Sequence, residues 1–450
     1  MAPPRMRRNI GWNLAEVIAS AVVLFVLYRV VITRLGIDAL GAWSLVAATT
    51  SLGRAFDLGA AGGLARYVAL SDGKRESRDQ AATYVDSAVL LNIGIYLAIA
   101  LAMYLPASWS LSRVTHGAAE HQVQALLPWS LAAFALASIF NVIASALIGF
   151  GRSDVKSAIV IFGVVGQALV ALIAVPRLGL VGLALAQISQ FLVQLLVGWM
   201  FVVRQIHGRF QLRAPLRWSR AALRELLGFG VRLQTINLVG FLHEPAIRYV
   251  FAAVGGVAML GYYEMAARCV SQIRAVLSAP TQNLVPMFAK IGPADRVQLV
   301  RTYEVAVAGL AATSLVSLGG FAAATPIVSL LWIGEVKWEF VTYAVICSAG
   351  WFPNLLAIPA FYLGIGLNHL RWNVGGAFAT TLLSPLMAYV LGVAFGRPGL
   401  VAGAMIGVSV GALITMVMNS RAFGLNPLPR LSRTPSILRE AIQQIIRPNG

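Results

Sequence analysis

Long apolar runs alternate with short polar segments along the whole 450-residue chain. Because a helix needs about 20 apolar residues to cross a bilayer, this pattern predicts about a dozen transmembrane helices. The expected crossings are centred near Leu24, Thr50, Ile93, Ala137, Val165, Phe191, Asn237, Ser271, Leu310, Trp351, Leu383 and Val408. The pattern therefore predicts an all-α polytopic membrane protein with about 12 transmembrane helices.

Basic residues are concentrated in every second polar segment, and the segments between them carry few positive charges. Lysine and arginine are retained on the cytoplasmic side of a membrane protein, which predicts that both termini are cytoplasmic. The segments assigned to that side contain Arg5, Lys74, Arg152, Arg204 to Arg224, Lys290 and Arg371.

The two halves of the chain resemble each other. Residues 36–43 (GIDALGAW) align with 256–263 (GVAMLGYY), and the same offset places Arg54 opposite Arg274. Residues 147–151 similarly match 362–366, and 177–182 match 397–403. Six crossings per half give both halves the same orientation, which predicts two pseudo-twofold-related six-helix bundles around a central cavity.

The repeat predicts a division of the chain into four parts. The N-terminal six-helix bundle covers 1–203, a basic cytoplasmic connector covers 204–225, and the second bundle covers 226–420. A cytoplasmic tail follows over 421–450, where apolar residues at helical spacing predict an amphipathic helix on the inner leaflet.

The composition excludes several classes of protein. A mean hydropathy of +0.77 with only 12% charged residues is incompatible with a soluble globule. The two cysteines and five histidines show no ligand spacing, so we expect no metal site and no cofactor. The net charge of +18 follows the loop pattern and indicates topology, so nucleic acid is not an expected partner.

Charged residues inside the expected crossings are the strongest candidates for function, because a charge at membrane depth normally faces a cavity or a partner. The second crossing carries Arg54 and, three residues later, Asp57, which could neutralise it. The first crossing carries Arg29 near its outer end, where it could either face the cavity or extend to the headgroups.

The seventh crossing has a polar face. Gln234, Asn237, Glu244 and Arg248 fall within an arc of about 80° on a helix of 100° per residue. Glu244 and Arg248 could form an i, i+4 ion pair that neutralises itself, but the two amides favour a face that lines a cavity.

The eighth crossing is similar. Glu264, Arg268 and Gln272 share one broad face, and the first two could again pair at i, i+4. Arg274 lies at the edge of this face with no acidic residue within two turns, so it needs a ligand or a partner on another helix. Arginines outnumber carboxylates, which predicts an electropositive cavity suited to a diphosphate or another anionic head group.

Several short motifs resemble the polysaccharide (O-antigen and exopolysaccharide) flippase branch of the multidrug/oligosaccharidyl-lipid/polysaccharide exporter superfamily, which also contains multidrug extrusion transporters and lipid II flippases. They are Leu35-Gly36, Leu40-Gly41, Phe56-Asp57-Leu58-Gly59, Arg66-Tyr67-Val68-Ala69, Leu260-Gly261-Tyr262-Tyr263 and Val285-Pro286. The resemblance implies two bundles forming a V that opens alternately to either side. It also implies that an undecaprenyl-diphosphate-linked oligosaccharide or polysaccharide repeat unit is moved across a bacterial inner membrane.

Lipid II flippases similarly use arginines on their first, second and eighth crossings, to which Arg29, Arg54, Arg268 and Arg274 could correspond. This chain departs in having about twelve crossings where those proteins have fourteen. We expect Arg54, Arg268 and Arg274 to hold the diphosphate, with Arg248 and Arg29 as further candidates.

For energy coupling, Asp57, Glu244 and Glu264 could bind a proton or a sodium ion. The alternative function is a cation-coupled multidrug or metabolite exporter. A glycan polymerase or ligase is disfavoured, because no long outer loop offers an acid, a base or a nucleophile. Expected partners are the lipid-linked glycan, membrane lipids and, in the cell, a polysaccharide polymerase and a chain-length regulator.

Overall fold

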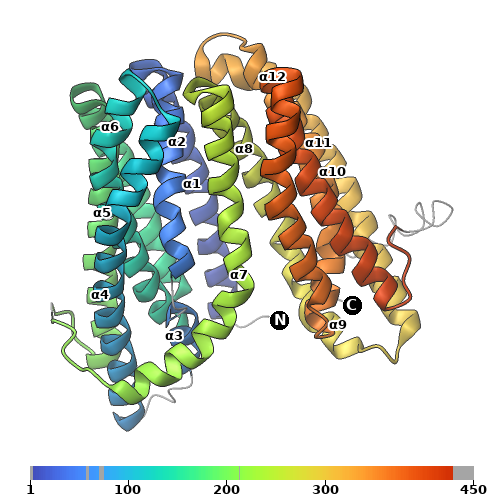
Figure 1. Cartoon of the computed structure of the whole chain (residues 1–450). Helices are drawn as coiled ribbons and strands as arrows, with labels where there is room; N and C mark the ends of the chain where they lie inside the picture. Colours follow the sequence, from blue (N-terminus) through green and yellow to red (C-terminus); the bar gives the residue numbers. More distant parts are fainter. Residues whose placement is uncertain (1–3, 57–59, 70–74, 212, 429–450) are drawn as a thin grey trace. The chain divides into compact units, whose positions relative to one another are not determined.

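The protein is a helical membrane protein in which the described residues form no strand (Figure 1). The computed structural model describes residues 4–56, 60–69, 75–211 and 213–428, without the side chains of 228–241 and of some residues near the gaps. The helices are α1 (Pro4–Leu35), α2 (Ile37–Ser51), η1 (Leu52–Phe56), α3 (Ala60–Ala69), α4 (Arg75–Val114), α5 (Ala118–Gly149), α6 (Ser153–His207), α7 (Arg220–Gly255), α8 (Val257–Ser278), η2 (Pro280–Asn283), α9 (Leu284–Ile291), α10 (Arg296–Ile333), α11 (Trp338–Gly366) and α12 (Arg371–Ala422).

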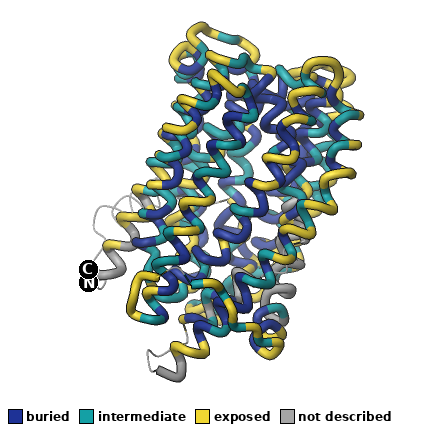
Figure 2. The backbone as a smooth tube through the Cα atoms, turned by 90° about the vertical axis from the view of Figure 1, so that its left-hand side faces the viewer, coloured by how far each residue is buried: buried dark blue, intermediate teal, exposed yellow. Residues whose placement is uncertain are grey.

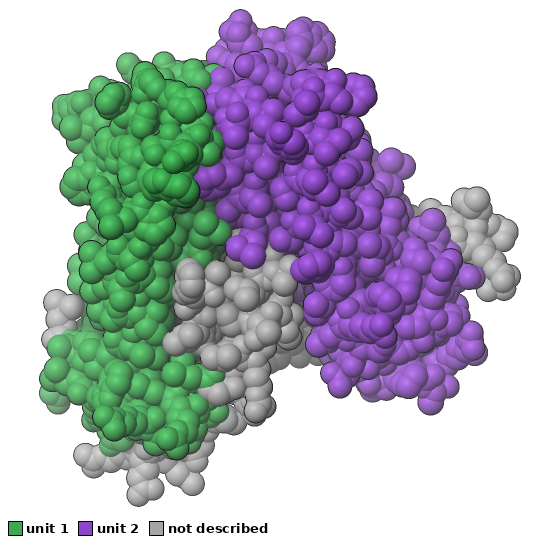
Figure 3. All heavy atoms as spheres, in the orientation of Figure 1, with its two compact units in different colours: residues 1–241 green, residues 242–450 purple. Residues whose placement is uncertain are grey.

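The chain divides into two compact units, Met1–Phe241 and Leu242–Gly450 (Figure 3). We call them unit 1 and unit 2 and describe each by itself. This boundary lies inside α7, and the functional division at 204–225 stays a prediction. The amphipathic helix expected in the tail lies outside the described residues.

The connector between α6 and α7 packs against α4 in unit 1. Arg217 Nη1 lies 2.9 Å from Asp79 Oδ1, and Arg213 Nη2 lies 3.4 Å from the buried Asp86 Oδ2. Ser87 Oγ also donates to the Arg217 carbonyl oxygen at 3.0 Å. The connector is therefore fixed to the N-terminal part of α4 by side chains and by backbone groups.

Seven helices in the described chain are long and apolar enough to cross a membrane: α1, α4, α5, α6, α10, α11 and α12. Two of them hold two crossings each, because α6 and α12 contain 55 and 52 residues and a straight helix of that length would span about 80 Å. Gly179 and Gly396 interrupt them with non-helical backbone. The seven helices thus cover nine of the twelve crossing centres expected from the sequence.

The other three expected crossings are the ones that carry the candidate polar residues. The second and eighth are divided into α2–η1–α3 and α8–η2–α9, and α7 forms the seventh as one helix. None of these helices meets the length and hydropathy expected of a lipid-embedded span within the described residues. α2 is short, with 15 residues, and α7 and α8 carry charged side chains, which fits helices that face protein or water on one side.

The internal repeat is confirmed at the start of α2 and α8. Gly36 adopts φ 87° and ψ 173°, and Gly256 adopts φ 83° and ψ 166°. A side chain is disfavoured at such positive φ values, which explains why both halves use glycine here. The offset of 220 residues predicted from the sequence holds at this turn.

The second sequence match was aligned two residues out of register. It paired Gly149 with Gly364, whereas the structure gives Gly149 and Gly366 the same surroundings. A Cβ on Gly149 would lie 2.8 Å from the Ala65 backbone oxygen, and one on Gly366 would lie 2.8 Å from that of Val285. The positive φ two residues later falls on Gly151 in one half and on Asn368 in the other, so no shared glycine marked the register.

The third match was three residues out of register. It paired Gly179 with Gly399, but the kinks lie at Gly179 (φ 59°, ψ −139°) and Gly396 (φ 69°, ψ −154°). Each kink is followed three residues later by a glycine, Gly182 or Gly399, whose Cβ would clash with the backbone eight residues before it. The later crossings of the two halves therefore correspond at an offset of 217 residues.

Burial follows the helix faces, with buried positions grouped along inner faces and exposed positions on outer ones (Figure 2). The core of unit 1 includes Phe140, Leu147 and Trp199, and that of unit 2 includes Phe288 and Tyr303. Large apolar side chains also cover the outer faces, including Leu101, Phe162, Val316 and Val393. Such exposure suits contact with lipid.

Candidate functional site

The polar faces of α7 and α8 meet in unit 2 around one buried carboxylate. Glu264 is 1% exposed, and its Oε2 atom accepts from Arg248 Nη2 at 2.8 Å and from Arg248 Nε at 3.1 Å. Its Oε1 atom accepts from Arg268 Nε at 2.6 Å. Arg248 also binds Glu244 Oε2 at 2.9 Å. The four side chains form a continuous network of ion pairs.

This network contains two arginines and two carboxylates, so it is close to neutral. Both i, i+4 pairs considered from the sequence are present, and Arg248 joins them across the two helices. Burial is uneven, because the Glu244 side chain is 71% exposed and that of Glu264 only 2%. Glu264 is thus committed to its arginines, whereas Glu244 remains accessible.

Arg274, two turns beyond this network on α8, has partners of a different kind. Its Nε atom donates to Asn354 Oδ1 at 3.1 Å, and its guanidinium carbon lies 4.6 Å from the centre of the Trp351 ring. Both partners belong to α11, so the cross-helix partner required by the sequence exists. Arg274 forms no ion pair with any described residue, and an amide oxygen and an aromatic ring orient its charge without cancelling it.

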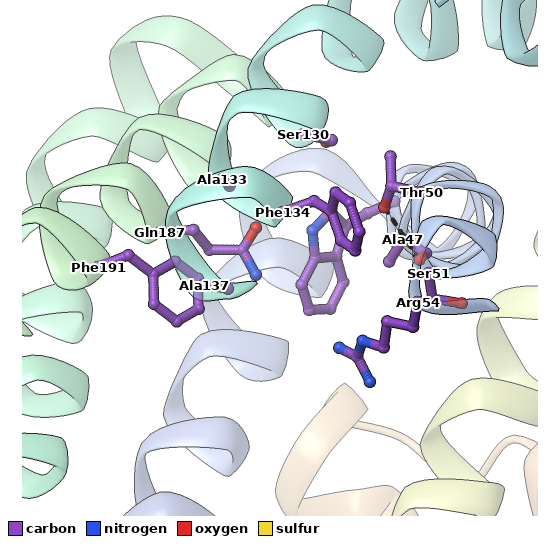
Figure 4. Close-up of a pocket in the computed structure, with 11 residues that line it drawn as sticks. Ala47, Thr50, Ser51, Arg54, Ser130, Ala133, Phe134, Ala137, Gln187 and Phe191 are labelled. Atoms are coloured by element: carbon purple, nitrogen blue, oxygen red, sulfur yellow. Dashed lines mark hydrogen bonds between the residues drawn. The ribbon is translucent and has the colours of Figure 1, made fainter. Parts of the chain in front are cut away.

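In unit 1, Arg54 borders a cavity of about 130 Å³ between the end of α2, α5 and α6. Figure 4 shows Thr50 and Ser51 at the end of α2 and Arg54 of η1 on one side of the cavity, with Gln187 and Phe191 of α6 on the other. α5 contributes three small lining residues, Ser130, Ala133 and Ala137, and one aromatic ring, that of Phe134. The Arg54 side chain is exposed.

The repeat shows that Arg54 and Arg274 occupy equivalent places in their own units. At the offset found for the later helices, Phe134 corresponds to Trp351 and Ala137 to Asn354. The sequence did not identify Trp351 or Asn354 as site residues. The signal that could have found them is the repeat itself, once its register is corrected by the kink glycines.

Two further sequence candidates that the structure describes, Arg29 and Gln272, belong neither to the ion-pair network in unit 2 nor to the cavity lining in unit 1. Arg29 on α1 is exposed, whereas Glu16 on the same helix binds Lys156 of α6 at 2.6 Å. Gln272 is half-buried on α8. Asp57 and the side chains of Gln234 and Asn237 lie outside the described residues, so their proposed roles stay predictions.

Metal ligation has no candidate in the part of the chain that the structure describes. No group of three or more His, Cys, Asp or Glu side chains converges there. The two cysteines, Cys269 and Cys347, are free thiols.

Comparison with known proteins identifies both a family and a fold. A family model described as polysaccharide biosynthesis protein matches residues 45–340. No curated protein matches the chain closely enough to serve as a relative.

Among solved structures, an inward-facing multidrug resistance MATE family transporter of the MOP superfamily gives a TM-score of 0.71 at 15% identity, covering 90% of this chain and 94% of its own. The lipid II flippase MurJ in an inward closed conformation gives 0.66 at 10% identity, covering 97% and 92%. The eukaryotic MATE transporter AtDTX14 gives 0.63 at 14% identity, covering 98% and 100%.

These identities are low, so the solved structures establish the fold only. The family model covers well over half of the sequence. The chain belongs to the polysaccharide biosynthesis protein family and is a multi-pass membrane protein with the fold of the MOP-superfamily transporters and flippases.

Proposed function

We propose that this protein is a flippase that moves an undecaprenyl-diphosphate-linked oligosaccharide or polysaccharide repeat unit across the bacterial inner membrane by alternating access. The glycan would travel through a hydrated cavity while the polyprenyl tail stays in lipid. Family membership supports a role in polysaccharide biosynthesis, and the fold supports transport.

The observation that carries the proposal is the state of Arg274. It is a permanent cation at membrane depth, held by a neutral amide and an aromatic ring with no carboxylate among the described residues. A guanidinium oriented in this way retains donors for a diphosphate, which it can bind through two parallel hydrogen bonds. Arg54 occupies the equivalent place in unit 1 and is the second proposed ligand.

The role proposed for Arg248 and Arg268 differs from the diphosphate-binding role expected from the sequence. Both bind Glu264, so their charge is largely balanced. We infer that they shape the network and that Arg268, whose side chain is 43% exposed, can contribute to the diphosphate at its outer edge. Glu244 is the more accessible of the two described carboxylates proposed for ion coupling.

The test follows the leaflet distribution of lipid-linked glycan in a strain depleted of this protein. Wild type should restore export, whereas Arg274→Ala should leave glycan in the inner leaflet and lower export roughly tenfold or more, as expected when a charge-assisted hydrogen bond is lost. Arg274→Lys should rescue only in part, because an ammonium lacks the planar fork. Arg397→Ala, which removes an exposed pair with Glu339, is the matched control.

Normal export by Arg274→Ala and Arg54→Ala at normal protein levels would overturn the cationic site. The alternative, a cation-coupled multidrug or metabolite exporter, predicts the opposite pattern. In that case Glu244→Gln would abolish activity, drug tolerance would change, and the glycan distribution would stay normal.

A further inference from the structure

The cavity beside Arg54 in unit 1 has the lining of a site for a small polar ring. Its walls combine three aromatic rings, those of Trp43, Phe134 and Phe191, with polar groups from three helices. Its volume is about 130 Å³. Cavities of about 150 Å³ bind benzene, so this one has the size for a single six-membered ring.

Three polar groups in this cavity are left for a ligand. The Trp43 indole NH, the Ser130 hydroxyl and the Gln187 amide make no hydrogen bond to any residue that the structure describes. Trp43 and Ser130 are buried as residues, with 8% and 6% exposure, but their polar atoms keep accessible surface and can be reached from the cavity. Polar atoms that face a cavity and have no protein partner are satisfied by water or by a ligand, so these three groups are available to a ligand.

The aromatic walls are held in place by other rings. Trp43 packs edge-on against the fully buried Tyr28, with centroids 5.9 Å apart, and Phe134 packs edge-on against Tyr96 at 5.8 Å. Gly53 makes room for Phe134, because a Cβ there would lie 2.5 Å from its Cζ atom. The walls are therefore set before any ligand arrives, which lowers the entropic cost of binding.

The equivalent place in unit 2 is built differently. There Arg274 stacks on Trp351 and binds Asn354, a polar side chain where unit 1 has the small Ala137. At the same offset, Ser130 corresponds to Cys347 and Gln187 to Ala404. The repeat fold alone therefore does not require the polar lining of unit 1.

We propose that this cavity binds one sugar ring of the transported glycan, next to the diphosphate held by Arg54. A pyranose carries C–H groups on its faces and hydroxyl groups around its edge, which match the aromatic walls and the free donors and acceptors respectively. The site would recognise the sugar that is attached directly to the lipid diphosphate. This inference rests on the proposed function and adds the residues that recognise the carbohydrate.

The test measures direct binding of free monosaccharides to the purified full-length protein by saturation-transfer NMR. Glucose, galactose and N-acetylglucosamine at millimolar concentration are the probes. Wild type should transfer saturation to at least one of them, and Gln187→Leu should weaken the binding by about fivefold, as expected for one lost hydrogen bond. Ala137→Met, which fills the cavity and leaves its polar groups intact, should weaken it at least as much.

Gln122→Leu changes an exposed glutamine at the start of α5 and is the matched control, which should bind like wild type. Thermal unfolding of each variant verifies that it is folded. No saturation transfer from wild type to any probe, or equal transfer from wild type, Gln187→Leu and Ala137→Met, would overturn the sugar site.

Failure of the sugar site and failure of the flippase are distinguishable. The binding measurement contains no lipid and no transport step, and the leaflet assay with Arg274→Ala does not involve this cavity. Sugar binding lost in Gln187→Leu together with normal export by Arg274→Ala would keep the site and reject the proposed diphosphate mechanism. The reverse result would keep the mechanism and reject the site.

Discussion

Two charged residues of α8, Glu264 and Arg274, have different kinds of partner. Glu264 pairs with Arg248 and Arg268, and Glu244 completes a network that is close to neutral. Arg274 instead has Asn354 and Trp351. A carboxylate partner would lower the cost of burying an arginine but would also cancel its field, whereas an amide and a ring orient the guanidinium and leave its charge available. This difference separates a structural cluster from a site that attracts anions.

The Glu264 network gives a prediction about stability. Glu264→Ala leaves two arginines facing each other, and breaking a buried pair in this way should lower the free energy of unfolding by about 3–5 kcal/mol. Glu244→Ala removes an exposed partner of Arg248 and should cost less than about 1 kcal/mol. Thermal or chemical unfolding in detergent measures both. Equal losses in the two variants would contradict the structural role assigned to Glu264.

A second prediction at this scale separates the charge of Arg274 from its geometry. Asn354→Asp keeps the size of the partner and the acceptor atom but adds a negative charge, so the protein should remain at least as stable as wild type. Glycan export should nevertheless fall roughly tenfold, because the carboxylate competes with the diphosphate for the guanidinium. The leaflet assay and an unfolding curve on the same variant test this together. Full export by Asn354→Asp would show that the net charge at Arg274 is not needed.

At the scale of elements, glycines at positive φ divide the long helices into crossings. Gly179 breaks α6 and Gly396 breaks α12 with closely similar backbone angles. Proline contributes at neighbouring positions, with Pro176 in α6 and Pro398 in α12. The non-helical backbone falls on the glycines and the prolines keep helical angles, so we infer that each hairpin depends on its positive-φ glycine.

This dependence predicts opposite effects for two glycines in the same helix. Gly179→Ala forces a side chain into the left-handed region and should destabilise the protein by about 1–2 kcal/mol. Gly166→Ala lies in regular helix with open space around its Cβ, and it should be neutral or stabilising by up to about 1 kcal/mol. Unfolding measurements on the two variants compare them directly. A neutral Gly179→Ala would mean that the break is set by the neighbouring prolines.

The sequence predicted the crossings better than it predicted the register between the two halves. The length of an apolar run is enough to predict a transmembrane helix, and every expected centre falls on a helix of the structure. Register depends on single backbone positions, and the positive φ of the turns after α5 and after α11 falls on Gly151 and on Asn368. An alignment based on shared glycines is shifted where an asparagine adopts the positive φ in place of a glycine.

The candidate site was predictable for the same reason only in part. Charged residues in apolar helices stand out, so Glu264, Arg268 and Arg274 were found from the sequence. The partners of Arg274 are not charged, and nothing in an apolar run distinguishes Trp351, or Gln187 across from Arg54, from ordinary packing residues. Which side chains meet across helices depends on helix rotation and packing, and the hydropathy pattern does not fix either.

At the scale of the whole molecule, the distribution of charge determines how the protein is inserted. The connector between α6 and α7 carries many of the basic residues, and Arg213 and Arg217 bind Asp86 and Asp79 of α4. The same arginines for which the positive-inside rule predicts a cytoplasmic position also fix the connector to unit 1. By contrast, the turn between α4 and α5 holds Gly117 and the exposed His116.

This asymmetry predicts the topology of the whole chain. In a variant with Cys269→Ala and Cys347→Ala, His116→Cys should react with a membrane-impermeant maleimide in intact cells, whereas Gln211→Cys should react only after permeabilisation. Both positions are exposed in the structure, so lack of reaction in intact cells reports the side of the membrane and not burial. Labelling in the opposite order would invert the protein and place the basic connector outside. A diphosphate lipid made in the cytoplasm would then meet the transporter from the wrong face, so the same measurement tests the direction in which a flippase of this topology must work.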